Sequence, residues 1–220
     1  MTLYAEIGGA SVIEARVVVP KLGAWFADVV LATEVQLGGS LVLTIANLAW
    51  TCAVWRGSTY QGRTKARVIG GAAGWRKSLK VQPYANPNGV MLSTVLRDAA
   101  SAVGEKLSLT DPDVAVGQFY VRELAPAERM LNRLATQWHI GPDGTTIVGP
   151  WPDSSAFTSA FDVVDYDPSI AVATIATEDL AGVTPGRTIA KPQLGAAVLT
   201  ISCVVHTLAA KGVRTEVLAA

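Results

Sequence analysis

The middle of the chain contains the sequence VMLSTVLRDAASAV, residues 90–103, whose apolar side chains recur at helical spacing. Gly104 follows it, and glycine is the residue that most often ends a helix. A second helical pattern, PAERMLNRLA, occupies residues 126–135, with Pro126 in its first turn. The apolar positions of the two patterns are Leu92, Val95, Leu96, Ala99 and Val103, then Met130, Leu131, Leu134 and Ala135. We predict two amphipathic helices, each with one buried face.

Both flanks of this region have the residue patterns of short β-strands. The N-terminal flank has such segments about ten residues apart, separated by glycine turns such as Gly38-Gly39 and Gly70-Gly71. The strands predicted before the helices are residues 11–19, 24–31, 41–45, 49–55 and 63–69. Those predicted after the helices are residues 163–166, 171–176, 187–190, 196–205 and 214–218. Short strands at this spacing predict a barrel or sandwich.

The domain organisation is predicted from two features of the central region. Residues 83–89 contain two prolines, two asparagines and a glycine, a composition typical of a linker. Residues 138–148 predict a hairpin with Asp143-Gly144 at its tip. We therefore expect an α+β, mainly β protein with two β-barrel-like domains and a small α/β domain inserted between them. The expected boundaries are 1–82 for the first barrel, 83–150 for the α/β insertion and 151–220 for the second barrel.

The chain is hydrophobic and electrically neutral. Half of its 220 residues are apolar, 16% are charged and the mean hydropathy is +0.34. No apolar run reaches the roughly 18 residues of a membrane-spanning helix, so we expect no such segment. The 18 basic and 18 acidic residues lack the basic excess of nucleic-acid-binding proteins. The apolar excess indicates surfaces covered by partner subunits, or alternatively a β-rich monomer with a large core.

Two basic segments suggest phosphate binding only superficially. Arg63, Lys65 and Arg67 are spaced by two, which puts them on one face of a strand, either as a solvated face or as a phosphate-binding stripe. The glycine-rich residues 69–78 resemble a phosphate loop. However, Arg76 stands where that loop requires glycine, and no apolar helix follows. A glycine-rich crossover between strands is the interpretation we favour.

No catalytic, cofactor or metal site is predicted, and we do not expect an enzyme. Asp162, Asp165 and Asp167 form the densest acidic group, which could serve hydrolysis or calcium binding, but Asp residues beside a proline are typical of turn capping. His139 and His206 have no ligand at metal-binding spacing and lie in strand patterns. A serine–histidine hydrolase cannot be recognised by spacing and is unsupported here.

The cysteines and tryptophans complete the set of candidate residues. Cys52 and Cys203 lie in apolar strands and are expected to be free buried thiols, with a disulfide as the alternative. The N-terminal residues 1–4 lack the start of a signal peptide, which predicts synthesis in a cytoplasm. The six tryptophans could form a sugar-binding platform or could anchor cores and interfaces. Those we expect at subunit contacts are Trp25, Trp55, Trp75 and Trp151.

Several segments from residue 82 onward are similar in sequence to segments of a known protein family. They are NGV at 88–90, LSTVLRDAA at 92–100, APAERMLNRLA at 125–135, VDYDP at 164–168, VVH at 204–206 and GVRTE at 212–216, with Trp138, Leu180, Asp143-Gly144 and Pro185-Gly186. In these segments the chain resembles the baseplate hub proteins of tailed bacteriophages. The first 80 residues match that family only as generic barrel strands.

The resemblance implies a function as well as a fold. Hub proteins of this kind have two β-barrels flanking an α/β insertion, and three copies close into a ring that joins the tail tube to a distal tip or spike. The implied partners are two further copies of this chain, tail tube and distal tail or spike proteins, and DNA in transit. The implied location is the virion tail, assembled in the cytoplasm of the bacterial host. Under this interpretation the face of Arg63, Lys65 and Arg67 is a lumen or rim. The alternative is a receptor- or carbohydrate-binding β module of the tail tip, and a third hypothesis, an enzyme, would require Asp162, Asp165 or His206.

Overall fold

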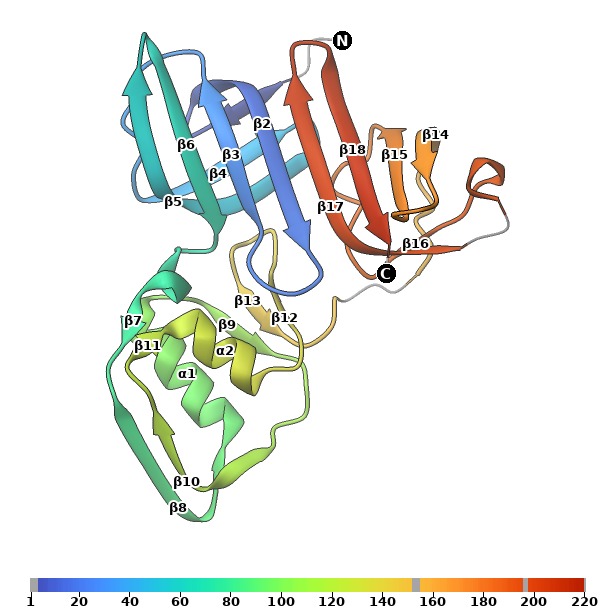
Figure 1. Ribbon diagram of the computed structural model, residues 1–220. Helices are drawn as coiled ribbons and strands as arrows, with labels where there is room; N and C mark the ends of the chain where they lie inside the picture. Colours follow the sequence, from blue (N-terminus) through green and yellow to red (C-terminus); the bar gives the residue numbers. More distant parts are fainter. Residues whose placement is uncertain (1–3, 152–154, 196–197, 220) are drawn as a thin grey trace.

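The computed structural model describes residues 4–151, 155–195 and 198–219, and the chain is mainly β (Figure 1). It contains two α-helices among these residues, α1 (Leu92–Val103) and α2 (Ala127–Leu134), both of which lie in the middle of the sequence. Within the described residues no helix is long and apolar enough to cross a membrane.

The first part of the chain closes into a six-stranded barrel. Its strands are β1 (Ala5–Ile7), β2 (Ala10–Pro20), β3 (Phe26–Leu31), β4 (Ser40–Ile45), β5 (Leu48–Tyr60) and β6 (Arg63–Gly70). They pair in the order β1-β4-β5-β6-β3-β2, and a pairing between β1 and β2 closes the ring. Alternate side chains point inward, so that Val17, Val29, Leu43 and Val68 are buried in the barrel interior. The alternation in the sequence thus correctly predicted five of the barrel strands, β2 to β6, and missed the short strand β1.

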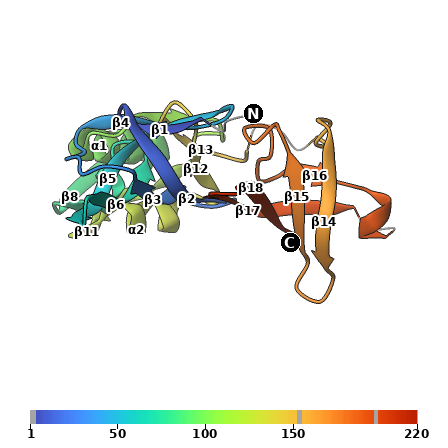
Figure 2. The same cartoon turned by 90° about the horizontal axis from the view of Figure 1, so that it is seen from above.

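The barrel sheet continues into the C-terminal part of the chain (Figure 2). The long strand β2 makes this possible: its residues Ala10 and Ser11 pair with β1, whereas the stretch from Ala15 to Pro20 pairs with β17. The strands beyond are β17 (Leu199–Ala209), β18 (Gly212–Ala219), β15 (Val172–Thr177) and β14 (Phe161–Asp167), in that order, and β16 (Thr188–Ile189) also pairs with β17. Every pairing along this path is antiparallel.

The central part forms a separate layer of small sheets and two helices below the barrel in Figure 1. Its elements are η1 (Gly74–Arg76), β7 (Ser78–Leu79), β8 (Gln82–Met91), α1, β9 (Leu107–Leu109), β10 (Ala115–Arg122), β11 (Ala125–Pro126), α2, β12 (Trp138–Ile140) and β13 (Thr146–Val148). The predicted hairpin is present as β12 and β13, with β9 added in parallel.

The helices follow their apolar stripes. The side of α1 that carries Val95, Leu96 and Ala99 is fully buried, and Gly104 ends the helix with a φ of 78°. No side chain of α1 caps its own N-terminus. Instead, Asp113 in the loop before β10 caps this end of the helix. The Asp113 carboxylate accepts hydrogen bonds from the Ser93 N–H at 2.9 Å and from the Ser93 hydroxyl at 2.6 Å.

The expected linker at residues 83–89 is wrong, because these residues belong to strand β8, which pairs with β10 in a two-stranded ribbon. A ribbon has two unpaired edges, where the missing N–H of a proline costs no ladder hydrogen bond. In addition, the register shifts between Phe119 and Gly117, so that the residues after Ala85 lie in an irregular part of the ribbon. Local composition signalled a break where the chain continues as an irregular strand.

Candidate assembly surface

The outer face of the continuous sheet carries most of the charged residues singled out in the sequence. In β6, Arg63 and Lys65 are exposed and Arg67 is half-buried, whereas Thr64 and Ala66 point into the barrel. The three basic side chains therefore share the outer face, as their spacing of two requires.

A row of arginines crosses this face from strand to strand. Register places Arg56 of β5 opposite Arg67 of β6, Arg67 opposite Asp28 of β3, and Asp28 opposite Arg16 of β2. The row continues through Thr207 of β17 to Arg214 of β18. Residues directly opposite each other in neighbouring strands have side chains close enough to interact, so this row is a band of charge over five of these six strands, interrupted at Thr207.

Acidic side chains within the band offset part of its positive charge. Arg67 donates to Asp28 through Nε and Nη2, both at 2.6 Å, and its guanidinium also lies over the Phe26 ring at 5.2 Å. A hollow of about 560 Å³ on the same face is lined by both signs of charge, including Glu14 and Asp28 beside Arg16 and Lys65. A phosphate-binding stripe would require an unbalanced positive potential, so the structure favours the solvated face.

The three aspartates lie on the same outer face, at the far end of the sheet. Asp162, Asp165 and Asp167 are exposed on β14. Asp167 accepts hydrogen bonds from the N–H of Ser169 at 2.9 Å and from its hydroxyl at 2.6 Å, and these bonds lower the pKa of the Asp167 carboxyl. The predicted turn-capping role is therefore confirmed for Asp167. Among the described residues, no group of three or more histidine, cysteine or acidic side chains is arranged to hold a metal ion.

The histidines do not join these carboxylates. His206 of β17 lies opposite Thr215 of β18, which lies opposite Ile175 of β15, and the side chains of these three residues are on the inner side of the sheet. Asp165 lies opposite Thr174, the neighbour of Ile175, and therefore faces outward. His206 is 1% exposed and its Nδ1 lies 2.9 Å from the Thr215 hydroxyl. His139 is also buried, and its ring stacks on Trp151 at 4.1 Å. The sequence-based hypothesis of hydrolysis by Asp165 and His206 has no support in this geometry, since the sheet separates them.

The four tryptophans predicted at subunit contacts occupy different environments. Trp25 packs edge-on against Trp50 inside the barrel, with ring centroids 5.0 Å apart, and is 1% exposed. Trp75 is 3% exposed and donates from Nε1 to the Thr146 hydroxyl at 2.7 Å. Both are therefore core residues of this chain. Their apolar strand and loop contexts could not distinguish a core from an interface.

The other two tryptophans reach the surface. Trp55 is 36% exposed, with the guanidinium groups of Arg56 and Arg76 at 4.7 and 5.2 Å from its ring centroid. Arg76 also pairs with Glu128 of α2 at 2.9 Å, so this cluster connects the barrel to the central layer. Trp151 is half-buried and donates from Nε1 to the Lys21 carbonyl at 3.1 Å. Cys52 and Cys203 are free thiols, as predicted, but only Cys52 is buried, whereas Cys203 is half-buried.

The glycine-rich loop after β6 binds a carboxylate of the chain itself. Glu105 is 8% exposed and accepts hydrogen bonds from the N–H groups of Gly74 at 2.5 Å and Ala72 at 3.2 Å. A Cβ at Gly71 would lie 2.6 Å from Glu105 Oε2, so the loop must be glycine at that position. The backbone donors of this loop therefore bind an internal carboxylate, Glu105, which the sequence analysis missed. Its position directly after the helix stop Gly104 was the available signal.

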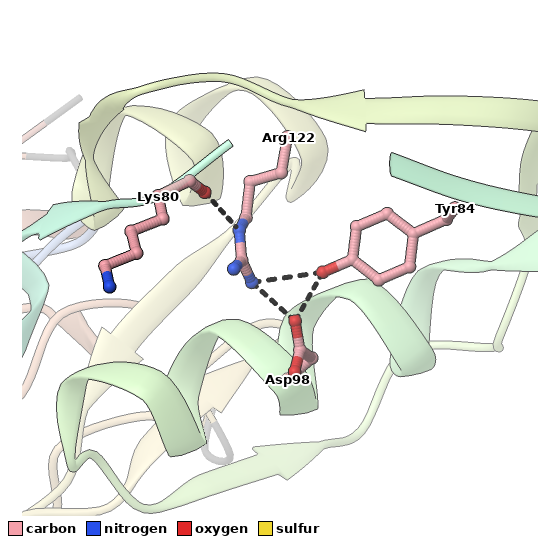
Figure 3. A network of polar contacts seen from close by, with 4 residues as sticks. All are labelled: Lys80, Tyr84, Asp98 and Arg122. Atoms are coloured by element: carbon pink, nitrogen blue, oxygen red, sulfur yellow. Dashed lines mark hydrogen bonds and ion pairs between the residues drawn. The ribbon is translucent and has the colours of Figure 1, made fainter. Parts of the chain in front are cut away.

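A second buried network fixes the β8–β10 ribbon to α1 (Figure 3). Arg122 is 5% exposed and donates from Nη1 to Asp98 Oδ2 at 2.6 Å and to the Tyr84 hydroxyl at 3.0 Å. Its Nε donates to the Lys80 carbonyl at 3.2 Å, and the Tyr84 hydroxyl donates to the same Asp98 oxygen at 2.5 Å. Burial raises the pKa of Tyr84, and the bond to Asp98 adds to this. Tyr84, Asp98 and Arg122 come from β8, α1 and β10, and Lys80 comes from the loop before β8. No local sequence pattern indicates that these residues meet.

Comparison with known proteins gives no match to any family model and none to any curated protein. Solved structures do match along nearly the whole chain. The 43 kDa tail protein of prophage MuSo2 from Shewanella oneidensis has a TM-score of 0.69 at 9% identity, over 99% of this chain and 97% of that one. The chain has the fold of phage tail proteins.

Two further structures support the same fold. A tail protein from Neisseria meningitidis MC58 has a TM-score of 0.63 at 16% identity, over 98% of this chain and 94% of that one. The E. coli c3393 protein has a TM-score of 0.68 at 10% identity, over 98% of this chain and 76% of that one. It is described as a component of the type VI secretion system with structural similarity to the T4 tail proteins gp27 and gp5. The tail-protein fold is thus shared at identities too low to transfer residue roles.

Proposed function

We propose that this chain is a structural component of a phage tail or of a related phage-derived particle. The observation that carries the proposal is the fold itself, which agrees with tail proteins over 99%, 98% and 98% of the chain. The continuous sheet offers a charged outer face, and Asp165 and His206, which might have formed a catalytic site, lie on opposite sides of that sheet. A charge-banded sheet face suits contact between proteins better than catalysis.

In the finer form of this proposal, the chain is an oligomeric hub, a trimer, that joins the tail tube to the distal tip. Two barrel-like domains, 1–82 and 151–220, flank the α/β insertion 83–150, and three copies present six such domains around the ring. Isologous or ring contacts of an obligate oligomer require large surfaces, and Trp55 and Trp151 are the predicted contact tryptophans that retain exposed area in this chain.

The ring would surround a channel through which DNA passes. The mixed charge of the outer sheet face fits this role, because a strongly basic lumen would retain the phosphate backbone through counterion release. Arg67 is already neutralised by Asp28, which leaves Arg63 and Lys65 as the less constrained cations of β6. Assembly in the cytoplasm of the bacterial host, followed by residence in the virion tail, completes the proposal.

The carbohydrate-binding alternative finds little support in the positions of the tryptophans. Trp25, Trp50, Trp75 and Trp138 are at most 3% exposed. A sugar platform needs neighbouring exposed rings, and the two remaining tryptophans are engaged separately, Trp55 by arginines and Trp151 by His139.

The experiment that tests the proposal is localisation in purified particles. Particles would be isolated from the bacterium that encodes the chain, and the chain would be identified by mass spectrometry and placed by antibody labelling in electron micrographs. We expect label at the distal end of the tail tube. Absence of the chain from intact particles would overturn the proposal, and label along the whole tube or on fibres would overturn its hub form.

A further inference from the structure

The two-stranded ribbon of β8 and β10 has one face bound to the rest of the chain. Tyr84 and Tyr120 lie directly opposite each other on this inner face, with their ring centroids 6.1 Å apart. Arg122 lies on the same face and donates to Asp98 of α1 at 2.6 Å, as Figure 3 shows. Because this buried network holds the ribbon against α1, the direction in which the other face points is fixed.

The outer face of the ribbon is apolar and exposed. Pro83 lies opposite Val121, and Ala85 lies opposite Phe119, so these four side chains share the outer face. Phe119 is 78% exposed and Val121 is 55% exposed, and Val81, just before β8, is 59% exposed. A contiguous apolar patch that a chain leaves uncovered marks a site of interaction.

The ribbon also lacks charged side chains over most of its length. Neither residues 81–91 nor residues 114–121 contain one, although 16% of the whole chain is charged. The exposed polar side chains of these segments are amides, such as those of Asn86, Asn88 and Gln118. Charged groups are expensive to bring into a lipid bilayer, whereas apolar and aromatic groups enter its interface readily. The composition of this surface therefore suits contact with lipid.

Two prolines reduce the hydrogen-bonding capacity of the β8 edge. Pro83 and Pro87 have no backbone N–H, and Pro83 still pairs with Val121 in the ribbon. An edge with fewer donors opposes the addition of a further strand. It also costs less to remove from water, because fewer polar groups lose their partners. The ribbon is thus suited to contact through its face and not through its edge.

The outer face is small and lies at one end of the molecule. In Figure 1 the ribbon forms the end opposite the barrel. Five residues of a strand extend about 17 Å, and paired strands are about 5 Å apart. A face of this size falls far short of the roughly 800 Å² that each partner contributes to a stable protein interface. A bilayer surface requires no such area and no matching shape, so it can cover a small projecting face completely.

We propose that the outer face of the β8–β10 ribbon binds the surface of a lipid bilayer, with Phe119 and Val121 at the boundary between headgroups and acyl chains. Apolar faces of peripheral segments reach about 5–10 Å into this region. The ribbon edges stay within reach of headgroup water, because an open sheet edge cannot enter the hydrocarbon. Binding of this kind goes beyond the proposed function and does not depend on it.

Flotation of the full chain with phosphatidylcholine vesicles tests the proposal. We expect the wild type to float with the vesicles. Phe119→Thr with Val121→Thr keeps strand-forming residues in β10 and should weaken binding about tenfold or more, because two apolar side chains no longer enter the lipid. Binding should require no anionic lipid. It should also not weaken between about 0.1 M and about 1 M NaCl, although the Debye length falls from about 10 to about 3 Å.

A matched control and a measurement without variants complete the test. Val164→Thr with Ile170→Thr changes two apolar residues of the C-terminal part that are 62% and 65% exposed, and should leave binding unchanged. Far-UV circular dichroism establishes that each variant is folded. Hydrogen exchange of the wild type, which needs no variant, should show vesicle-dependent protection confined to β8 and β10.

Four outcomes would overturn the lipid contact. The first is a wild type that does not float, and the second is a folded ribbon variant that floats as well as the wild type. The third is binding that needs anionic lipid and disappears at high salt, which would assign it to a charged surface elsewhere. The fourth is self-association, seen in sedimentation velocity, that the ribbon variant loses while neither protein binds vesicles. That result would assign the outer face to a second copy of the chain.

Discussion

The Glu105 carboxylate accepts a hydrogen bond from the Gly74 N–H at 2.5 Å and thereby occupies a loop that would otherwise present unpaired backbone donors. It does so while nearly buried, and burial raises the pKa of Glu105 although the N–H groups of Ala72, Gly74 and Trp75 act in the opposite direction. The carboxylate joins the end of α1 to the loop after β6, and so connects the central layer to the barrel.

Glu105→Ala should lower the free energy of unfolding by about 2–3 kcal/mol, because it leaves buried N–H groups without an acceptor. Urea denaturation followed by circular dichroism measures the change. Lys106→Ala is the neighbouring control, since Lys106 is exposed, and should change stability by less than about 0.5 kcal/mol. Equal stabilities of the two variants would show that water replaces the carboxylate without cost.

Asp98→Ala should destabilise the central layer by about 2 kcal/mol, because buried Arg122 then loses the carboxylate to which it donates. The Asp98 side chain is 49% exposed, so solvent moderates the loss. Tyr84→Phe removes only the hydroxyl and should cost about 1 kcal/mol. Hydrogen exchange is the measurement that localises the effect, and we expect faster exchange of the β8–β10 amides in Asp98→Ala.

The sequence correctly predicted the elements whose signal is local. Alternation at residues 11–19 became β2, and the apolar stripe at residues 92–103 became α1. The sequence did not predict which distant strands pair with each other. That β2 pairs with both β1 and β17 depends on its eleven-residue length and on strands that follow far later in the chain. Periodicity records which face of a strand is buried but carries no information on which strand lies beside it.

In the candidate surface, too, the features set by local spacing could be predicted and those set by distant strands could not. The shared face of Arg63, Lys65 and Arg67 could be derived from spacing alone, but the aspartate that neutralises Arg67 is on another strand. Trp25 and Trp55 were both predicted at subunit contacts, yet Trp25 is fully buried against Trp50, whereas Trp55 lies at the surface beside Arg56 and Arg76. Burial of a large side chain is decided by what the fold brings against it.

Gly70→Ala should be among the most disruptive single-methyl changes in the barrel. A Cβ at Gly70 would overlap the Trp25 indole, which is itself held against Trp50, so the ring must shift in a packed interior. We expect a loss of about 2–3 kcal/mol and an altered tryptophan emission spectrum. Gly57→Ala is the matched control in the partner strand, because its Cβ would be 3.6 Å from the nearest atom. A small loss at both positions would mean that the ring adapts freely.

Acid should destabilise the protein through its two buried histidines. Burial lowers the pKa of His206 and of His139 from the usual 6.5 to about 4. The unfolded chain therefore binds more protons than the folded chain between pH 6.5 and pH 4. Stability from these groups is fully present above pH 6.5 and is lost as the pH falls toward 4. Within this window each histidine should reduce the free energy of unfolding by up to about 1.4 kcal/mol per pH unit.

His206→Gln should remove one proton from this pH dependence, and the same change at His139 should remove the other. Urea denaturation from pH 7 to pH 5 gives the slope of the unfolding free energy against pH for each variant, and we expect the double variant to lose most of this slope. The aspartates with lowered pKa, such as Asp167, cost stability only as their unfolded forms protonate, from about pH 5 downward, so the range above pH 5 isolates the histidines from them. A His206→Gln profile parallel to that of the wild type would show that this imidazole is protonated in the folded state, with its Nε2 paired rather than buried without a partner.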